Sequence, residues 1–197
     1  MRIICISGHA QHGKDTAAQF MKEALEACGQ KVLVTHYADL LKHICKSFFG
    51  WDGEKDESGR TLLQHVGTDV IRKKRPDFWV SFVADILTLF DNVWDYVIIS
   101  DTRFPNELKY LGKKGFDVIH TRVHRYNFES PLSEEQKKHQ SETALDDVEP
   151  DEWLFNWNLE QFRDEVYEFI VSMLQKAQMP PVQMLYQMSI FDRPQER

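Results

Sequence analysis

Short apolar runs alternate along the chain with longer segments in which apolar residues recur every three or four positions. The apolar runs predict five strands, at residues 2–7, 31–37, 96–100, 116–123 and 154–157. The helical spacing predicts helices at residues 16–28, 40–49, 60–74, 77–90 and 159–174, and a short one after Pro105. Strands that alternate with helices in this way predict an α/β fold with a mainly parallel sheet.

The polar stretches divide the chain further. Residues 51–59 are polar and contain two glycines, which predicts a loop. Residues 124–152 are almost wholly polar, and a connection of that length in a compact domain is usually functional or mobile. We therefore expect one domain at residues 1–178 with a lid at about 124–152, and a C-terminal extension at 179–197 that opens with Pro180-Pro181.

Composition narrows the function classes. The 197 residues are 42% hydrophobic and carry a net charge of −7, which disfavours binding to duplex nucleic acid but leaves room for a nucleotide pocket with local cations. No apolar run is long enough for a membrane span or a signal peptide, so the expected location is the cytoplasm. Three widely spaced cysteines predict neither a zinc site nor a disulfide framework.

A phosphate-binding loop follows the first predicted strand. Residues 8–14 read Gly-His-Ala-Gln-His-Gly-Lys, which fits G-x-x-x-x-G-K between a strand and a helix. Such a loop points several N–H groups at one place, where the helix dipole also favours an anion, and Lys14 adds a cation. The expected ATP-binding residues are Gly8, His9, Ala10, Gln11, His12, Gly13, Lys14, Asp15 and Thr16.

The position after the lysine departs from this pattern. Asp15 and then Thr16 stand where Ser or Thr would ligate magnesium. A carboxylate is also a hard oxygen ligand for Mg²⁺. Asp15 is therefore expected to hold the ion directly or through water, or alternatively to cap the helix.

Four further blocks make the loop less generic. They are Leu-Gln-His-Val-Gly-Thr-Asp-Val-Ile at 63–71, Phe-Trp-Val at 78–80, Ile-Ile-Ser-Asp-Thr-Arg at 98–103, and His-Gln-Ser-Glu-Thr at 139–143. Together with Gly-Lys-Asp-Thr at 13–16, they resemble the phage-type deoxynucleoside monophosphate kinases over about residues 2–175, in the same order. The Gly-Thr-Asp and Asp-Thr-Arg blocks are much more specific than the loop.

The resemblance implies a P-loop kinase core with sheet order 2-3-1-4-5, a lid, and Mg²⁺-assisted transfer of the ATP γ-phosphoryl group to a deoxynucleoside monophosphate. Asp101 ends the third strand, where a carboxylate can meet the metal shell, so Asp15 and Asp101 are the expected metal-linked residues. Arg103 resembles the arginine that nucleotide kinases place on the acceptor phosphate. A salt-bridged surface pair is the alternative for Asp101 and Arg103.

A phosphate acceptor sets its own requirements. A phosphate monoester has a second pKa near about 6 and is already largely a dianion at neutral pH, so it needs charge screening rather than a general base. Arg122 and Arg125 leave the fourth strand at the start of the polar segment, where a lid belongs. The expected catalytic residues are Lys14, Arg103, Arg122 and Arg125, with Lys42 and Arg72 as further cations.

The remaining candidates concern the acceptor nucleoside. The expected substrate-binding residues are Asp39, Lys42, Gln64, Thr68, Asp69, Arg72, Trp79, Arg103, His139 and Glu142. Asp39 also suits the N-cap of the helix at 40–49, and Trp79 also suits the core. Arg72 begins a basic run that is otherwise a solvated helix end.

Two alternatives to this function remain. The first is a P-loop kinase for another small metabolite, of the dephospho-coenzyme A or phosphomevalonate type; a hydroxyl acceptor would require a base such as Asp39. The second is a nucleotide-binding regulator without turnover.

The C-terminal extension suggests a partner. Residues 187–191, Gln-Met-Ser-Ile-Phe, resemble the short peptide with which bacterial replication proteins bind the sliding clamp. Alternatively, Met184, Leu185, Met188 and Phe191 pack on the domain or on the second subunit of a homodimer.

Overall fold

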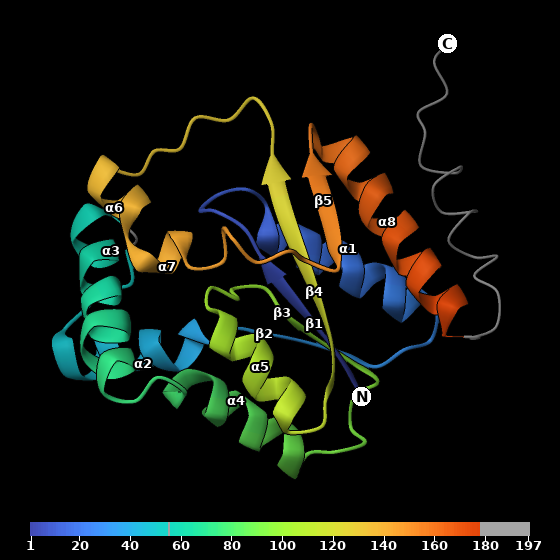
Figure 1. The fold of residues 1–197 in the computed structure, drawn as a ribbon, viewed down its shortest axis with the longest axis horizontal. Coiled ribbons are helices and arrows are strands. Elements are labelled where there is room, and N and C mark those ends of the chain that lie inside the picture. The colour runs from blue at the N-terminus through green and yellow to red at the C-terminus, as the bar shows by residue number, and fades with distance from the viewer. Residues whose placement is uncertain (55, 178–197) are drawn as a thin grey trace.

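The computed structural model describes residues 1–54 and 56–177 and contains one five-stranded sheet. All its neighbouring strands are parallel, in the order β2-β3-β1-β4-β5, which confirms the predicted fold class and strand order (Figure 1). The strands are β1 (Arg2–Ser7), β2 (Val32–Thr35), β3 (Tyr96–Ile99), β4 (Asp117–Arg125) and β5 (Glu152–Asn156). β1 is the central strand, and its residues Ile3, Ile4 and Ile6 are fully buried.

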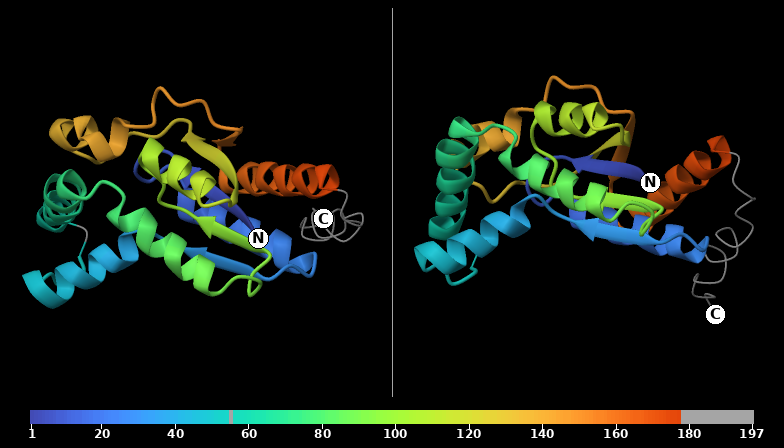
Figure 2. Two further views of the ribbon diagram at one scale, coloured as in Figure 1. Left: turned by 60° about the horizontal axis from the view of Figure 1, so that its bottom comes forward. Right: turned by 90° about the horizontal axis from the view of Figure 1, so that it is seen from below.

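Helices cover both faces of the sheet, as the two views of Figure 2 show. α1 (Lys14–Ala27) and α8 (Leu159–Lys176) lie on one face, while α4 (Phe78–Leu89) and α5 (Pro105–Lys113) lie on the other. Four helices gather at one end of the molecule: α2 (Ala38–Phe49), α3 (Glu57–Gln64), α6 (Glu134–Lys138) and α7 (Gln140–Thr143). This end of the molecule carries the site described below.

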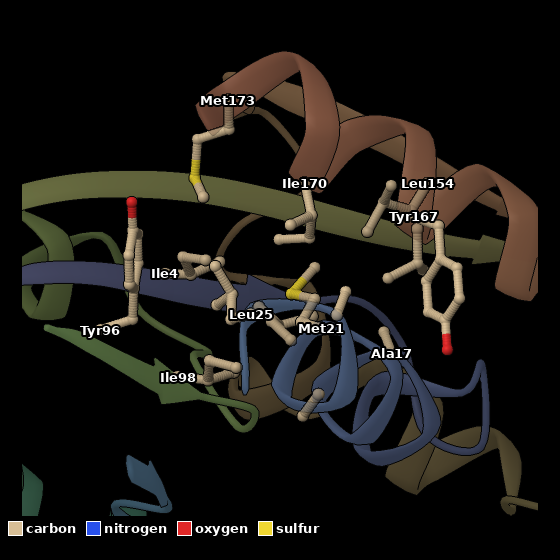
Figure 3. Close-up of a cluster of buried hydrophobic side chains, with 14 of the residues drawn as sticks. Ile4, Ala17, Met21, Leu25, Tyr96, Ile98, Leu154, Tyr167, Ile170 and Met173 are labelled. Carbon is tan, nitrogen blue, oxygen red and sulfur yellow. The ribbon is translucent and has the colours of Figure 1, made fainter. Parts of the chain in front are cut away.

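The core is divided by the sheet. Figure 3 shows the cluster between the sheet and the helices α1 and α8, in which Ile4, Met21 and Ile170 are completely buried. A second cluster on the opposite face joins Ile3, Val97 and Ile99 to α4, where Trp79 and Val80 are buried. The first cluster supports the strand and helix that flank the glycine loop.

The segment predicted as a loop at 51–59 and a helix at 60–74 is built differently. α3 begins at Glu57, because the side chain of Asp56 caps it by accepting a hydrogen bond from Gly59 N at 2.7 Å. After Gln64 the chain continues as a π-helix, η1 (His65–Arg72). Within η1, Trp79 Nε1 donates to the Gly67 carbonyl at 3.0 Å, and a Cβ on Gly67 would lie 2.7 Å from Leu41. Tertiary contacts with α2 and α4 therefore shape this segment.

Residues 124–152 contain more regular structure than their polarity suggested. β4 continues to Arg125, α6 and α7 follow, and β5 begins at Glu152. Side chains start both short helices, because Ser133 accepts a hydrogen bond from Gln136 N and His139 accepts one from Ser141 N. Across residues 1–54 and 56–177, none of the helices is long and apolar enough to span a membrane. The clamp-like peptide Gln187–Phe191 lies outside the described residues.

Candidate active site

A cavity of about 730 Å³ opens at the carboxyl ends of the parallel strands. Its walls come from the segments that directly follow β1, β2, β3 and β5, and from α2, α3 and η1. In open parallel sheets this edge is where ligands bind, since the loops there converge while the core stays intact. The cavity therefore joins the glycine loop to helices that are distant in sequence.

Two glycines fix the shape of the loop between β1 and α1. Gly8 has φ 137°, and a Cβ there would lie 2.5 Å from the carbonyl oxygen of Val123 on β4. Gly13 has φ 106°, and a Cβ there would lie 2.8 Å from Nδ2 of Asn156, which itself donates to the His12 carbonyl at 3.0 Å. Only glycine allows both the left-handed backbone and these close approaches. β4 and β5 thus hold the loop from outside.

Lys14 begins α1 and bends back over the loop. Its Nζ donates to the carbonyl oxygens of Gly8 and His9, both at 2.8 Å. Burial lowers the pKa of Lys14 to about 8, and the nearby positive charge of Arg103 adds to the effect. An anion in the cavity would raise this pKa again, because a nearby negative charge favours the charged form of the ammonium group.

Asp15 lies where a metal-linked residue was predicted. Its Oδ1 accepts a hydrogen bond from Ser100 Oγ at 2.6 Å and lies 3.5 Å from His36 Nε2. His36, and then Ser100, hold the pKa of the Asp15 carboxyl well below its usual range. Asp15 in turn raises the pKa of His36. The Asp15 carboxyl is therefore ionised at neutral pH, at the edge of the loop.

Asp101 serves the backbone after β2. Its two oxygens accept hydrogen bonds from the N–H groups of Tyr37 and Ala38, both at 2.9 Å. Asp101 thereby fixes the start of α2 and still lines the cavity. In the part of the chain that the structure describes, no group of three or more His, Cys, Asp or Glu side chains is arranged to hold a metal by itself.

The wall opposite the loop combines apolar and paired polar side chains. Leu41, Gln64, Thr68 and Trp79 line it, and Trp79 belongs also to the core, being only 4% exposed. A buried ion pair closes its base. Arg72 Nη2 lies 2.7 Å from Glu107 Oε1.

Glu107 is itself almost fully buried. Its Oε2 accepts hydrogen bonds from the N–H groups of Arg103 and Phe104. Burial raises the pKa of Glu107, while the charge of Arg72 opposes the shift. The guanidinium of Arg72 also lies over the Phe104 ring, at 3.9 Å from its centroid. Arg72 and Glu107 thus support the turn that carries Arg103.

Arg103 lines the cavity and is bound to α7. Its Nη1 donates to the Ser141 carbonyl at 2.8 Å and pairs with Glu142 Oε1. Glu142 Oε2 accepts a hydrogen bond from the N–H of Ala10 in the glycine loop at 3.1 Å. One arginine and one carboxylate therefore connect the loop, the turn after β3 and α7.

Most of the predicted site residues meet in this cavity. Those that line it are Ala10, Gln11, Gly13, Lys14, Asp15, Thr16, Lys42, Gln64, Thr68, Arg72, Trp79, Asp101, Arg103, Arg125 and Glu142. Arg125 lies beside the glycine loop, since its Nη1 donates to the Gln11 carbonyl at 3.3 Å. The cavity thus brings together residues far apart in the sequence, such as Ala10 and Glu142, which are 132 positions apart.

The other predicted residues lie beside the cavity rather than in its lining. They are Gly8, His9, His12, Asp39, Asp69, Arg122 and His139. Arg122 is buried on β4, where it binds the Leu145 carbonyl and Asp146, and it lines a separate small cavity together with Gly8. Asp39 pairs with Lys42 at 2.8 Å. Asp69 faces the two histidines His65 and His139, at 3.6 and 3.7 Å.

Several lining residues were not singled out from the sequence. They include His36, Ser100, Glu107, Asn156 and Trp157. His36 and Ser100 directly follow β2 and β3, so their position at strand ends was an available signal. Glu107 follows Asp101-Thr102-Arg103 closely and caps α5 as its third residue. Trp157 stacks on Tyr126 at 3.6 Å between ring centroids, a contact between the residues that directly follow β5 and β4, and no pattern in the sequence indicated it.

A parallel sheet of this order, with a glycine loop and a lysine between β1 and α1, defines the P-loop kinase fold. Residues 30–166 match the profile of the family described as deoxynucleotide monophosphate kinase, and the chain therefore belongs to that family. It is a phosphotransferase of the nucleotide monophosphate kinase type. The match begins after the glycine loop, so the loop at residues 8–16 is an independent observation.

Solved structures of several kinases are similar in part. A gluconokinase from Sinorhizobium meliloti 1021 has 14% identity and a TM-score of 0.49, over 90% of this chain and 95% of that one. Shikimate kinase from Aquifex aeolicus has 12% identity and a TM-score of 0.47, over 89% and 98%. An APS kinase from Mycobacterium tuberculosis has 12% identity and a TM-score of 0.46, over 86% and 96%. Comparison with curated protein sequences gives no match.

Proposed function

We propose that this protein transfers the γ-phosphoryl group of ATP to a deoxynucleoside monophosphate and so forms the diphosphate. The observation that carries the proposal is that Arg103 lines one cavity together with the glycine loop and with Gln64, Thr68 and Trp79. Family membership supports the nucleotide acceptor. The glycine loop would bind ATP, and the wall would bind the acceptor monophosphate.

The donor side follows from the loop. The N–H groups of residues 8–16 and the N-terminus of α1 bind the phosphates of ATP, and Lys14 screens the transferring group. Arg125 adds a cation beside Gln11. These groups stabilise charge as it moves onto the leaving oxygen, which is where preorganised cations contribute most to rate.

Magnesium fits this corner of the site. The ionised Asp15, together with Thr16 and water, would hold the ion against the phosphates, and Asp101 would act through water because both its oxygens already accept backbone hydrogen bonds. Mg²⁺ usually takes one or two carboxylates plus substrate phosphates rather than an all-protein cage. When bound, the ion supplies charge neutralisation between the β- and γ-phosphates.

The acceptor side requires cations more than a base. A monophosphate dianion is already nucleophilic at neutral pH, so Arg103, Arg72 and Lys42 need only bring it in line with ATP. Arg122 would contribute only indirectly, because its guanidinium is bound to Asp146 and to the Leu145 carbonyl. Asp39 pairs with Lys42 beside the cavity, an arrangement that suits orientation of the acceptor better than proton abstraction.

The polar segment supplies the cover. In this proposal residues 124–152 are a lid within a domain that spans residues 1–178, and α7 brings Glu142 and His139 to the acceptor. The side chains of α6 are largely exposed, as expected of an element that moves against the cavity. Closure would exclude water from the transferring phosphoryl group and so limit ATP hydrolysis.

A panel of deoxynucleoside and ribonucleoside monophosphates tests the proposal. We expect at least one deoxynucleoside monophosphate to stimulate ADP formation from ATP well above the rate without acceptor. An Asp39→Asn variant should keep most of this activity, because no base is needed. Stimulation by a hydroxyl acceptor alone, lost in Asp39→Asn with substrate binding intact, would instead identify a kinase for another small metabolite.

A further inference from the structure

The carboxylate of Glu142 lies in contact with the glycine loop. Its Oε2 accepts a hydrogen bond from Ala10 N at 3.1 Å, and its Oε1 pairs with Arg103. The Glu142 side chain is only 6% exposed. A shielded carboxylate that accepts from both a backbone N–H and a guanidinium makes charge-assisted hydrogen bonds, which are stronger than neutral ones.

The N–H of Ala10 is also a group that phosphate needs. Ala10 lies in the loop at residues 8–14 and lines the cavity, and loops of this pattern point several N–H groups at one anion. A carboxylate and a phosphate oxygen cannot both occupy the position in front of this N–H. Their negative charges also repel each other strongly when water is excluded. Binding of a triphosphate in the loop therefore requires Glu142 to leave.

The departure of Glu142 has a consequence for Arg103. Two acceptors on α7, the Ser141 carbonyl and Glu142, hold Nη1 of Arg103. When Glu142 moves away from Ala10, the Arg103 guanidinium loses its carboxylate partner and becomes available to another anion. The turn that carries Arg103 stays fixed, since its N–H remains bonded to the buried Glu107 at 2.8 Å.

We infer that Glu142 is an internal competitor for the phosphate site, and that its displacement by the donor triphosphate makes Arg103 available to the acceptor phosphate. The inference rests on the proposed function in one respect, that the loop binds a nucleoside triphosphate. It adds a coupling, because Glu142 both weakens the binding of the donor triphosphate and keeps Arg103 from the acceptor phosphate. Glu142 thereby links the order of the two binding events to the position of α7.

Charge removal at Glu142 tests the competition. Glu142→Gln keeps the shape of the side chain, and Glu142→Ala removes the acceptor altogether. We expect the Kd for ATP, measured by calorimetry, to fall roughly three- to tenfold in both variants, because ATP no longer displaces a charged hydrogen-bond acceptor. Inorganic tripolyphosphate should show the same gain. Glu135→Gln makes the same charge change at an exposed position of α6 and should leave both affinities unchanged.

The opposite result overturns the inference. If Glu142 only positioned Arg103 and other binding groups, ATP would bind its variants with the wild-type Kd or more weakly. A measurement on the wild-type protein covers the case in which the variants fail to fold. Tripolyphosphate alone should speed amide hydrogen exchange in residues 140–146, where α7 loses its anchor, and unchanged or slower exchange there contradicts displacement.

These outcomes are separate from those of the proposed function. If wild type and Glu142→Gln bound ATP equally well while deoxynucleoside monophosphates still stimulated ADP formation, the competitor role of Glu142 would be refuted and the proposed function would stand. Conversely, the Glu142 variants could bind ATP more tightly while the wild-type protein phosphorylated no deoxynucleoside monophosphate. That result would support the competitor role of Glu142 and refute the proposed acceptor.

Discussion

The proposed function gives the cavity a donor side and an acceptor side, and the charged groups of the two sides are held in different ways. On the donor side, one stretch of consecutive residues between β1 and α1 forms the loop, and Lys14 donates to main-chain oxygens of that same stretch. On the acceptor side, the wall comes from α2, α3, η1, α4 and the turn after β3. There the arginines are paired with carboxylates, Arg72 with Glu107 and Arg103 with Glu142.

This difference separates a site that is formed in advance from one that must rearrange. Backbone N–H groups keep their direction whatever the side chains do, so the donor loop is formed in advance except at Ala10, whose N–H is held by Glu142. Arg103 is instead bound to Ser141 and Glu142 on α7, so its availability to a phosphate would depend on the position of α7. Four predictions examine this contrast, in order of decreasing effect.

Loss of the donor-side cation should have the largest effect. Lys14→Ala removes a charge that acts mainly on the transferring group, so we expect turnover to fall roughly 10²–10³-fold with the fold retained. Steady-state ADP release and thermal unfolding measure the two properties. Lys22→Ala, on the exposed side of α1 where Lys22 pairs with Glu26, is the matched control. Near-normal turnover in a folded Lys14→Ala protein would refute the role given to the loop.

Loss of the buried pair Arg72–Glu107 should lower the free energy of unfolding more than loss of an exposed pair. Glu107→Ala leaves Arg72 and two backbone N–H groups without their acceptor, and breaking a buried pair costs about 3 kcal/mol. Urea unfolding measures this loss. Asp85→Ala breaks the exposed pair with Lys114 and should cost less than about 1 kcal/mol. Equal losses in the two variants would mean that burial of Glu107 has no energetic weight.

Arg103 should discriminate between the two substrates. Arg103→Ala is expected to raise the KM for the monophosphate by about tenfold or more, and that for ATP much less, since a charged hydrogen bond contributes about 1.5–3 kcal/mol. Initial rates with each substrate varied in turn give both constants. Lys109→Ala on the exposed side of α5 serves as the control. A similar rise for both substrates would place this arginine on the donor phosphates instead.

The smallest effect concerns pH and the strand that precedes the loop. His120 is buried on β4 with its Nε2 2.8 Å from Ser7 Oγ, and burial lowers its pKa to about 4 from 6.5. Between these values the unfolded chain binds more protons than the folded one. The free energy of unfolding should therefore fall as pH drops from about 6.5 to 4, by up to about 1.4 kcal/mol per unit.

Urea titrations at several pH values measure this slope. His120→Gln should flatten it, whereas His43→Gln on an exposed position of α2 should not. A slope that is identical in wild type and His120→Gln would show that the support of the loop by β4 does not depend on a neutral histidine.

Much of the fold was predictable because its signals are local. The apolar runs located all five strands to within a few residues, and Gly-x-x-x-x-Gly-Lys located the loop, since its two glycines have the positive φ that the turn requires. The structure departs most from the expected secondary structure at η1, and it adds two short helices within residues 124–152. In both segments, packing on distant residues such as Leu41 and Trp79, or capping by side chains, decided the backbone.

The sequence by itself determined the order of elements, the phosphate loop and the kinds of residue that would face a phosphate, because these depend on neighbours along the chain. Tertiary structure alone decided which charges meet. Glu142 reaches Ala10 across 132 residues, Arg72 reaches Glu107 across 35, and Arg122 is drawn to Asp146 away from the main cavity. Pairing of charges depends on distance and burial, and both are properties of the folded chain rather than of residue order.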